Sequence, residues 1–181
     1  GLVTSNRKVF AIGDVTGGAA FTHMAAHHAS VVVRRALFRL PAKVETRAVP
    51  WVTFTDPELA QVGPTAAAAE AEGLALRTLR WDFTDNDRAQ AERATAGFIK
   101  LVVDRRGRPL GATIVGAHAG ELVHLWVLAI QERIGLAKVA QMIAPYPTLG
   151  EVGKRAAGSW FTPGLFSART RWLVRLLLRL G

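Results

Sequence analysis

The first residues that could do chemistry lie where an apolar run ends in a glycine and an aspartate. Lys8–Ile12 has the composition of a strand, Gly13 and Asp14 follow it, and a helix is predicted from about Phe21 to Phe38. A loop between a strand end and a helix N-terminus presents backbone N–H groups and the positive end of the helix dipole. The pattern therefore predicts the edge of a ligand site, although an isolated Gly-Asp pair is also compatible with an ordinary turn.

A second group combines a phenol and a carboxylate, Tyr146 and Glu151, in the run Tyr-Pro-Thr-Leu-Gly-Glu. A tyrosine with its ordinary pKa of about 10 does not shuttle protons at neutral pH as an imidazole does. Glu151 begins a predicted helix, where a carboxylate also interacts favourably with the helix dipole. Both are candidate catalytic residues. The alternatives are packing at an interface for Tyr146 and a helix-start role for Glu151.

The histidine spacing and the cysteine content of the chain bear on metal and thiol chemistry. His23 and His27 are spaced as an i,i+4 pair, and His28 adjoins them, but no third ligand of the right type is spaced nearby. We therefore predict no metal site. The absence of cysteine excludes a disulfide framework and any thiol chemistry carried by this chain alone.

The elements that would position these residues form an α+β pattern over residues 48–160. We expect an antiparallel sheet with its helices on one side, preceded by one strand and one helix in residues 1–47 and followed by a basic tail in residues 161–181. Strands are predicted at 51–55, within 56–63, and at 75–81, 97–103 and 109–115; helices are predicted at 64–73, 119–134, 136–143 and from 151 onward.

An apolar stripe marks the predicted helix 119–134. Apolar side chains recur there at helical spacing, namely Leu122, Val123, Trp126, Val127 and Ile130. Because the unit already has apolar strands for a core, we expect this stripe to form an interface with a second copy.

The charge is unevenly distributed along the 181 residues. The net charge is +5 in residues 1–47, zero in 48–160 and +4 in 161–181. A nucleic-acid module would place its basic excess on the folded body, so we predict no nucleic-acid partner. No apolar run approaches the roughly 18 residues of a spanning helix, and no secretory leader opens the chain. We expect a cytoplasmic protein.

The tail alternates arginines with apolar residues over 167–180. Arg169, Arg171, Arg175 and Arg179 face one way in a helix, with Trp172 and several leucines on the other face. Such a helix suits a membrane interface, peripheral at the inner face of the membrane, or else packs on its own domain.

The chain resembles the pyridine nucleotide–disulfide oxidoreductases, the family of dihydrolipoamide dehydrogenase, glutathione reductase and mercuric reductase. Three blocks carry the resemblance: Thr4 through Asp14 with Thr22 and His23; Pro50 through Gly63; and Gly97 through Glu151. They follow one another in the family's order over nearly the whole chain. The resemblance implies that residues 1–47 close an FAD-binding domain and that residues 48–160 are the dimerisation domain.

The resemblance also implies roles for single residues. Gly13 and Asp14 match the family's flavin-site turn, whose carboxylate hydrogen-bonds a ribityl hydroxyl of FAD. Phe21, Thr22 and His23 match the helix N-terminus that faces the pyrimidine edge of the flavin. Tyr146 and Glu151 match a His-Pro-Thr-x-x-Glu block that enters the partner's active site in a homodimer.

This chain departs from the family's pattern in two ways. Tyr146 stands where the disulfide reductases have the basic histidine, which is similar to mercuric reductase, yet the Cys pair that ends mercuric reductases is absent. The Gly-rich FAD loop, the redox Cys pair and the nicotinamide domain are also absent from these residues. We therefore expect a C-terminal fragment of a homodimeric FAD-dependent NAD(P)H oxidoreductase, inactive alone, that needs the N-terminal portion of the same protein. The alternative is a non-catalytic self-associating module with a basic tail for a membrane surface.

Overall fold

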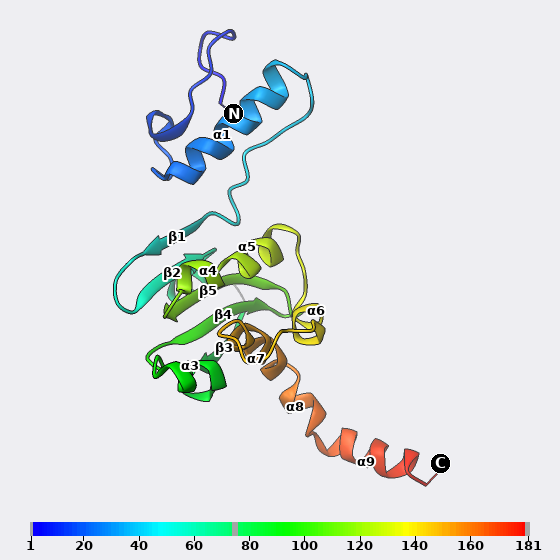
Figure 1. Cartoon of the computed structure of the whole chain (residues 1–181). Helices are drawn as coiled ribbons and strands as arrows, with labels where there is room; N and C mark the ends of the chain where they lie inside the picture. The colour runs from blue at the N-terminus through cyan, green and yellow to red at the C-terminus, as the bar shows by residue number, and fades with distance from the viewer. Residues whose placement is uncertain (1, 74–75, 180–181) are drawn as a thin grey trace. The chain divides into compact units, whose positions relative to one another are not determined.

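The computed structural model describes residues 2–73 and 76–179 and divides into two compact units, Gly1–Val49 and Pro50–Gly181 (Figure 1). Gly1, Ala75 at the start of a predicted strand, and Leu180 and Gly181 of the predicted tail lie outside the described residues. Each unit is described by itself.

The first unit is built around one helix, α1 (Thr22–Ala36), with a short 3-10 helix η1 (Gly13–Thr16) before it. Met24, His28 and Val31 are its buried residues, at the i, i+4, i+7 spacing of one helical face. The strand expected over Lys8–Ile12 is reduced to an isolated bridge between Val3 and Phe10. A strand requires a neighbouring strand, and the described residues of this unit supply a single bridging pair.

The second unit contains a five-stranded antiparallel sheet in the order β1-β2-β5-β4-β3. Its strands are β1 (Pro50–Thr53), β2 (Glu58–Val62), β3 (Leu76–Asp82), β4 (Phe98–Asp104) and β5 (Pro109–Gly116). The β4–β5 turn contains Gly107 at a φ of +75°, as expected for a hairpin that turns through glycine. The α+β antiparallel fold is therefore confirmed.

One face of this sheet forms the core. The register places Ile99 opposite Ile114 and Leu101 opposite Ala112, and all four side chains are buried. The other face keeps polar side chains, with the guanidinium of Arg80 lying 3.9 Å from the ring centroid of Phe98. Strand alternation explains this division, because successive side chains point to opposite faces.

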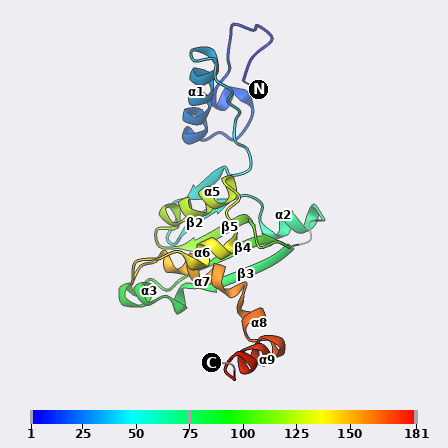
Figure 2. The ribbon, with the colours of Figure 1, turned by 90° about the vertical axis from the view of Figure 1, so that its right-hand side faces the viewer.

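The helices that pack on the sheet come mainly from the second half of the unit (Figures 1 and 2). α4 contacts β2 and β5, α5 contacts β5, and α7 contacts β3 and β4. The helices are α2 (Ala66–Ala71), α3 (Asp87–Glu92), α4 (Ala119–Leu122), α5 (His124–Gln131), α6 (Leu136–Gln141), α7 (Glu151–Ser159), α8 (Thr162–Leu165) and α9 (Ala168–Leu177), with a 3-10 turn η2 (Phe83–Asp85) before α3.

The apolar stripe of 119–134 has a different role from the one predicted. Val123, Trp126 and Ile130 are buried within this unit, and Trp126 is only 1% exposed. A Cβ on Gly153 of α7 would stand 3.3 Å from the indole of Trp126, so α5 and α7 pack closely. The prediction that Trp126 forms part of an exposed dimer face is wrong, because the stripe covers the sheet and α7.

None of the helices within residues 2–73 and 76–179 combines the length and apolarity needed to cross a bilayer.

Candidate functional site

The Gly-Asp turn is held against helix α1. Gly13 adopts a φ of +69°, and its N–H donates to Nδ1 of the buried His28 over 3.1 Å. A Cβ at Gly13 would lie 3.3 Å from the Cβ of Ala25, so both the backbone conformation and the close approach favour glycine. Asp14 is exposed in the first turn of η1. The turn is thus anchored while the carboxylate stays accessible.

The start of α1 has the features of an open helix N-terminus. Phe21 is the N-cap residue, with extended backbone and no side-chain cap. The first N–H groups bonded back to Phe21 O are those of Met24 and Ala25. The rings of Phe21 and His23 stack with centroids 5.1 Å apart. Thr22 and His23 therefore occupy the first turn, where the helix dipole favours a negatively charged group.

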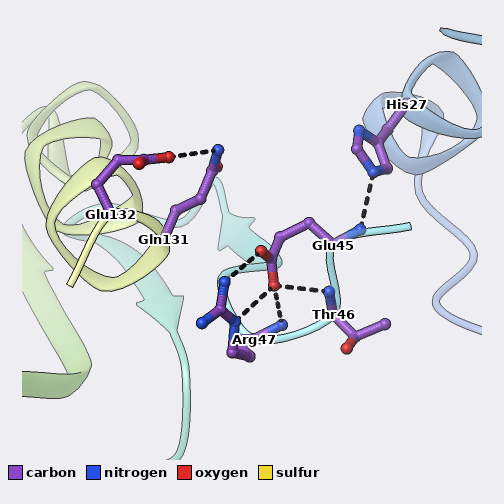
Figure 3. A network of polar contacts seen from close by, with 6 residues as sticks. All are labelled: His27, Glu45, Thr46, Arg47, Gln131 and Glu132. Atoms are coloured by element: carbon purple, nitrogen blue, oxygen red, sulfur yellow. Dashed lines mark hydrogen bonds and ion pairs between the residues drawn. The ribbon is translucent and has the colours of Figure 1, made fainter. Parts of the chain in front are cut away.

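His27 and His28 both accept backbone hydrogen bonds. Nε2 of His27 accepts from the N–H of Glu45 at 3.0 Å, as Figure 3 shows. The carboxylate of Glu45 accepts from the guanidinium of Arg47 at 2.8 Å and from the N–H of Thr46 at 2.9 Å. The hydrogen bond from Arg47 is the main cause that lowers the pKa of Glu45 to about 2. His28 thus joins η1 to α1, and His27 joins residue 45 to α1.

Histidine, cysteine, aspartate and glutamate form no group of three that could hold a metal ion within the described part of the chain.

Tyr146 lies on the surface of the second unit and contacts α3. Its side chain is 69% exposed, and its hydroxyl donates to Oδ2 of Asp87 at 2.8 Å. This hydrogen bond raises the pKa of Tyr146, because ionisation would place a phenolate beside a carboxylate. The phenol is therefore held protonated and acts as a hydrogen-bond donor rather than as a base.

Asn86 connects the Tyr146 loop, residues 142–150 between α6 and α7, to α3, a role that the sequence analysis missed. Its side chain is buried, its Oδ1 accepts the N–H of Ala89 at 2.9 Å, and its Nδ2 donates to the carbonyl of Thr148 at 3.1 Å. The local signal was present, since Asn before Asp-Arg-Ala is a typical helix N-cap. The bond to Thr148 crosses 62 residues and has no signal in the local sequence.

Glu151 is the first residue of α7 and closes the same loop. Its Oε2 accepts from the N–H of Thr148 at 3.5 Å, the longest bond in this group. The structure therefore brings Tyr146 and Thr148 into one loop, which Asn86 and Glu151 hold at Thr148. It places Gly13, Asp14, Phe21, Thr22 and His23 together in the first unit.

The titration of Tyr146 tests this arrangement directly, because it is the single tyrosine of the chain. In an ultraviolet titration, the phenolate is expected to appear at higher pH than in an unstructured peptide. Asp87→Asn should lower the midpoint towards the ordinary value, since the neighbouring negative charge is removed. Asp85→Asn, on the adjacent 3-10 turn, is the control and should leave the midpoint unchanged. If Asp87→Asn left the midpoint of the Tyr146 titration unchanged, the hydrogen bond between Tyr146 and Asp87 would be contradicted.

Comparison with known proteins shows that this chain is similar in sequence to one family of oxidoreductases. Residues 49–157 match the family model described as the pyridine nucleotide-disulphide oxidoreductase dimerisation domain. The chain is 37% identical to a mercuric reductase of Staphylococcus aureus over 157 residues, covering 86% of this chain and 29% of that enzyme. It is 37% identical to a dihydrolipoyl dehydrogenase of Geobacillus stearothermophilus over 155 residues, covering 85% of this chain and 33% of that enzyme.

A solved structure shows the same fold. LpdA from Mycobacterium tuberculosis superposes with a TM-score of 0.83 at 30% identity, over 88% of this chain and 35% of that one. The chain thus spans about a third of the length of the relatives that it matches.

Proposed function

The chain belongs to the pyridine nucleotide–disulphide oxidoreductases through their dimerisation domain, and on that premise we propose that it supplies the C-terminal part of a homodimeric, FAD-dependent NAD(P)H oxidoreductase. One observation carries the proposal. A Gly-Asp turn packed on an open helix N-terminus precedes, in one chain, a dimerisation-domain unit that carries the Tyr146 loop between α6 and α7. The cytoplasmic location and the requirement for an N-terminal portion of the same protein are parts of this proposal.

The first unit supports an association with further polypeptide. Several large apolar side chains are exposed in this unit: Val9, Ile12, Val15, Val33, Leu37, Phe38 and Leu40. A cavity of about 1140 Å³ runs beside α1, and its lining includes Met24, Val31 and Val44. Apolar surface of this kind usually marks an interaction site. We assign it to the remainder of an FAD-binding domain.

The residues of the first unit fit a flavin nucleotide chemically. The close approach of Gly13 to Ala25 leaves the turn without side-chain bulk, and Asp14 offers a charged acceptor for a sugar hydroxyl. The α1 N-terminus at Thr22 and His23 offers the positive dipole end to the flavin's electron-rich edge. FAD, when bound, would supply hydride and electron transfer. These residues orient the cofactor.

Tyr146 and Glu151 are assigned to the substrate side of a site shared between subunits. With its pKa raised, Tyr146 donates a hydrogen bond and holds its proton, so it does not replace a basic histidine. Glu151 provides a carboxylate at the start of α7. This pair suits orientation of a substrate or metal-ion cargo better than the general base catalysis of dithiol exchange. The described residues alone are proposed to be inactive.

The alternative is a non-catalytic, self-associating module with a basic tail for a membrane surface. Its basis is the exposed, arginine-rich helix α9, which follows the end of the family match at residue 157. The molar mass from light scattering does not distinguish the two proposals, because both require a dimer. A monomer at high protein concentration would contradict both.

Flavin retention distinguishes the oxidoreductase proposal from the non-catalytic module. In a chimera, this chain replaces the matching segment of the Staphylococcus aureus mercuric reductase, and bound flavin is measured by visible absorbance after gel filtration. We expect a yellow dimer. Asp14→Ala should weaken flavin retention by about tenfold or more, because a hydrogen bond to a charged acceptor is lost.

Asp85→Ala is the matched control, an exposed aspartate in the second unit whose loss should leave flavin content unchanged. A colourless chimera that still dimerises would support the non-catalytic module. Equal flavin content with and without Asp14→Ala would remove Asp14 from the site.

A further inference from the structure

Helix α9 leaves an apolar face uncovered at the end of the second unit. No residue of α9 is buried, and Trp172 and Leu177 are 64% and 56% exposed. The helix extends beyond α7 and α8, away from the sheet, in both views (Figures 1 and 2). The alternative that the tail packs on its own domain therefore finds no support in the described residues. The family match also ends at residue 157, before α9 begins.

Local interactions define the start of this helix. The hydroxyl of Ser167 accepts the N–H of Thr170 at 3.2 Å as an N-cap, and Thr170 Oγ1 donates to the carbonyl of Gly164 at 2.8 Å. These bonds join the start of α9 to α8 while leaving the helix sides open.

The charged and apolar residues of α9 lie on different sides. Arg171 and Arg175 are four residues apart, which aligns them on one side of the helix, and Arg179 follows in the turn after α9 and extends this arginine stripe. Leu173, Leu176 and Leu177 share the opposite side at i, i+3 and i+4. Trp172 precedes Leu173 and borders the arginine stripe. Arg169 lies toward the leucines in the first helical turn, where its long side chain can extend past the helix end to water.

We propose that α9 binds the surface of an anionic membrane, with the leucines in the acyl boundary and the arginine stripe at the headgroups. Residues 161–181 carry four arginines and no acidic side chain, which complements an anionic lipid surface. Tryptophan at the border of the two faces is suited to the headgroup region. A second copy of the tail fits less well, because it presents the same positive charge. This inference is independent of the proposed flavin chemistry.

Vesicle co-sedimentation of the full chain tests the proposal. The probe is phosphatidylcholine vesicles with or without phosphatidylglycerol, and binding is expected only in the presence of the anionic lipid. The variant R171Q/R175Q/R179Q should bind about 100-fold more weakly, since each basic residue near an anionic surface contributes about a factor of five. The variant L176S/L177S should weaken binding by at least about tenfold through the lost apolar contact.

A matched control removes the same number of positive charges as the triple tail variant, but from another part of the chain. R105Q/R106Q/R108Q removes three exposed arginines from the β4–β5 turn and should bind as the unmodified chain does. The fluorescence of Trp172 should shift to the blue on binding, and that shift should disappear in Trp172→Phe.

Equal loss of binding in the tail and turn variants would overturn the proposal, because it would reveal a net-charge effect. Equal binding to neutral vesicles would overturn the electrostatic part of it. If the unmodified chain does not sediment with anionic vesicles, the membrane is excluded as the occupant, and an acidic protein surface becomes the partner to test.

Discussion

Replacing Trp126 by alanine is expected to lower the free energy of unfolding of the sheet unit by about 3–5 kcal/mol. The side chain is 1% exposed and packs against Gly153 of α7. It also lines a small pocket of about 190 Å³ with Ile99 and Ile114. Truncation would enlarge that pocket at the junction of the sheet, α5 and α7. The loss is large because the neighbouring backbone cannot collapse into the space.

Urea unfolding followed by far-ultraviolet circular dichroism measures this effect without relying on tryptophan emission. Trp172→Ala is the control: at 64% exposed, its loss should change the free energy of unfolding by less than about 0.5 kcal/mol. If Trp126→Ala were equally mild, the packing of α5 on α7 would be wrong. Because α7 begins with Glu151, the same substitution should also loosen the Tyr146 loop.

Replacing Asn86 by alanine is expected to cost about 2–4 kcal/mol, the second largest effect. The substitution removes the N-cap of α3 and leaves the carbonyl of Thr148 without its amide donor. The substitution therefore removes both hydrogen bonds through which Asn86 joins α3 to the Tyr146 loop. The midpoint of the Tyr146 titration should fall towards its ordinary value, because Asp87 and the loop no longer hold each other in place.

Asn86→Asp separates the two contributions. A carboxylate keeps the acceptor for the N–H of Ala89 but has no amide to donate to Thr148, so it should restore the cap and not the loop. Glu92→Ala is the surface control on α3, where loss of an exposed i,i+4 pair with Arg88 should cost less than about 0.5 kcal/mol. A titration midpoint of Tyr146 that stays unchanged in Asn86→Ala would show that Asn86 does not position the loop.

The Tyr146 loop shows why the structure changes the interpretation of the candidate site. Spacing alone left Tyr146 as either a catalytic residue or a packing residue, and the side chain proves to be exposed and hydrogen-bonded to Asp87. A donor phenol with a raised pKa is chemically distinct from an imidazole base. The candidate site therefore offers a hydrogen-bond donor at the position where the resemblance implies a basic histidine.

Much of the fold was predictable from local pattern. The sequence predicted the β4–β5 hairpin with its glycine turn, and helices α1 and α7, within a few residues. Helical spacing predicted one helix over 119–134, which the structure divides into α4 and α5. These predictions depend on side-chain periods of two and about 3.6 residues, which the backbone geometry imposes on any amphipathic strand or helix. The antiparallel α+β class follows from the order of these elements.

By itself, then, the sequence determined the five strands and most helices of the second unit, the Gly-Asp turn, and the amphipathic character of α9. Only the tertiary structure decided that Trp126 packs inward, that Asn86 bonds to Thr148 across 62 residues and that Tyr146 donates to Asp87 across 59. It also decided that Lys8–Ile12 forms no extended ladder here. The physical reason is that local period specifies which face of an element is apolar, whereas its partner is selected by the packing of distant segments, which no local spacing records.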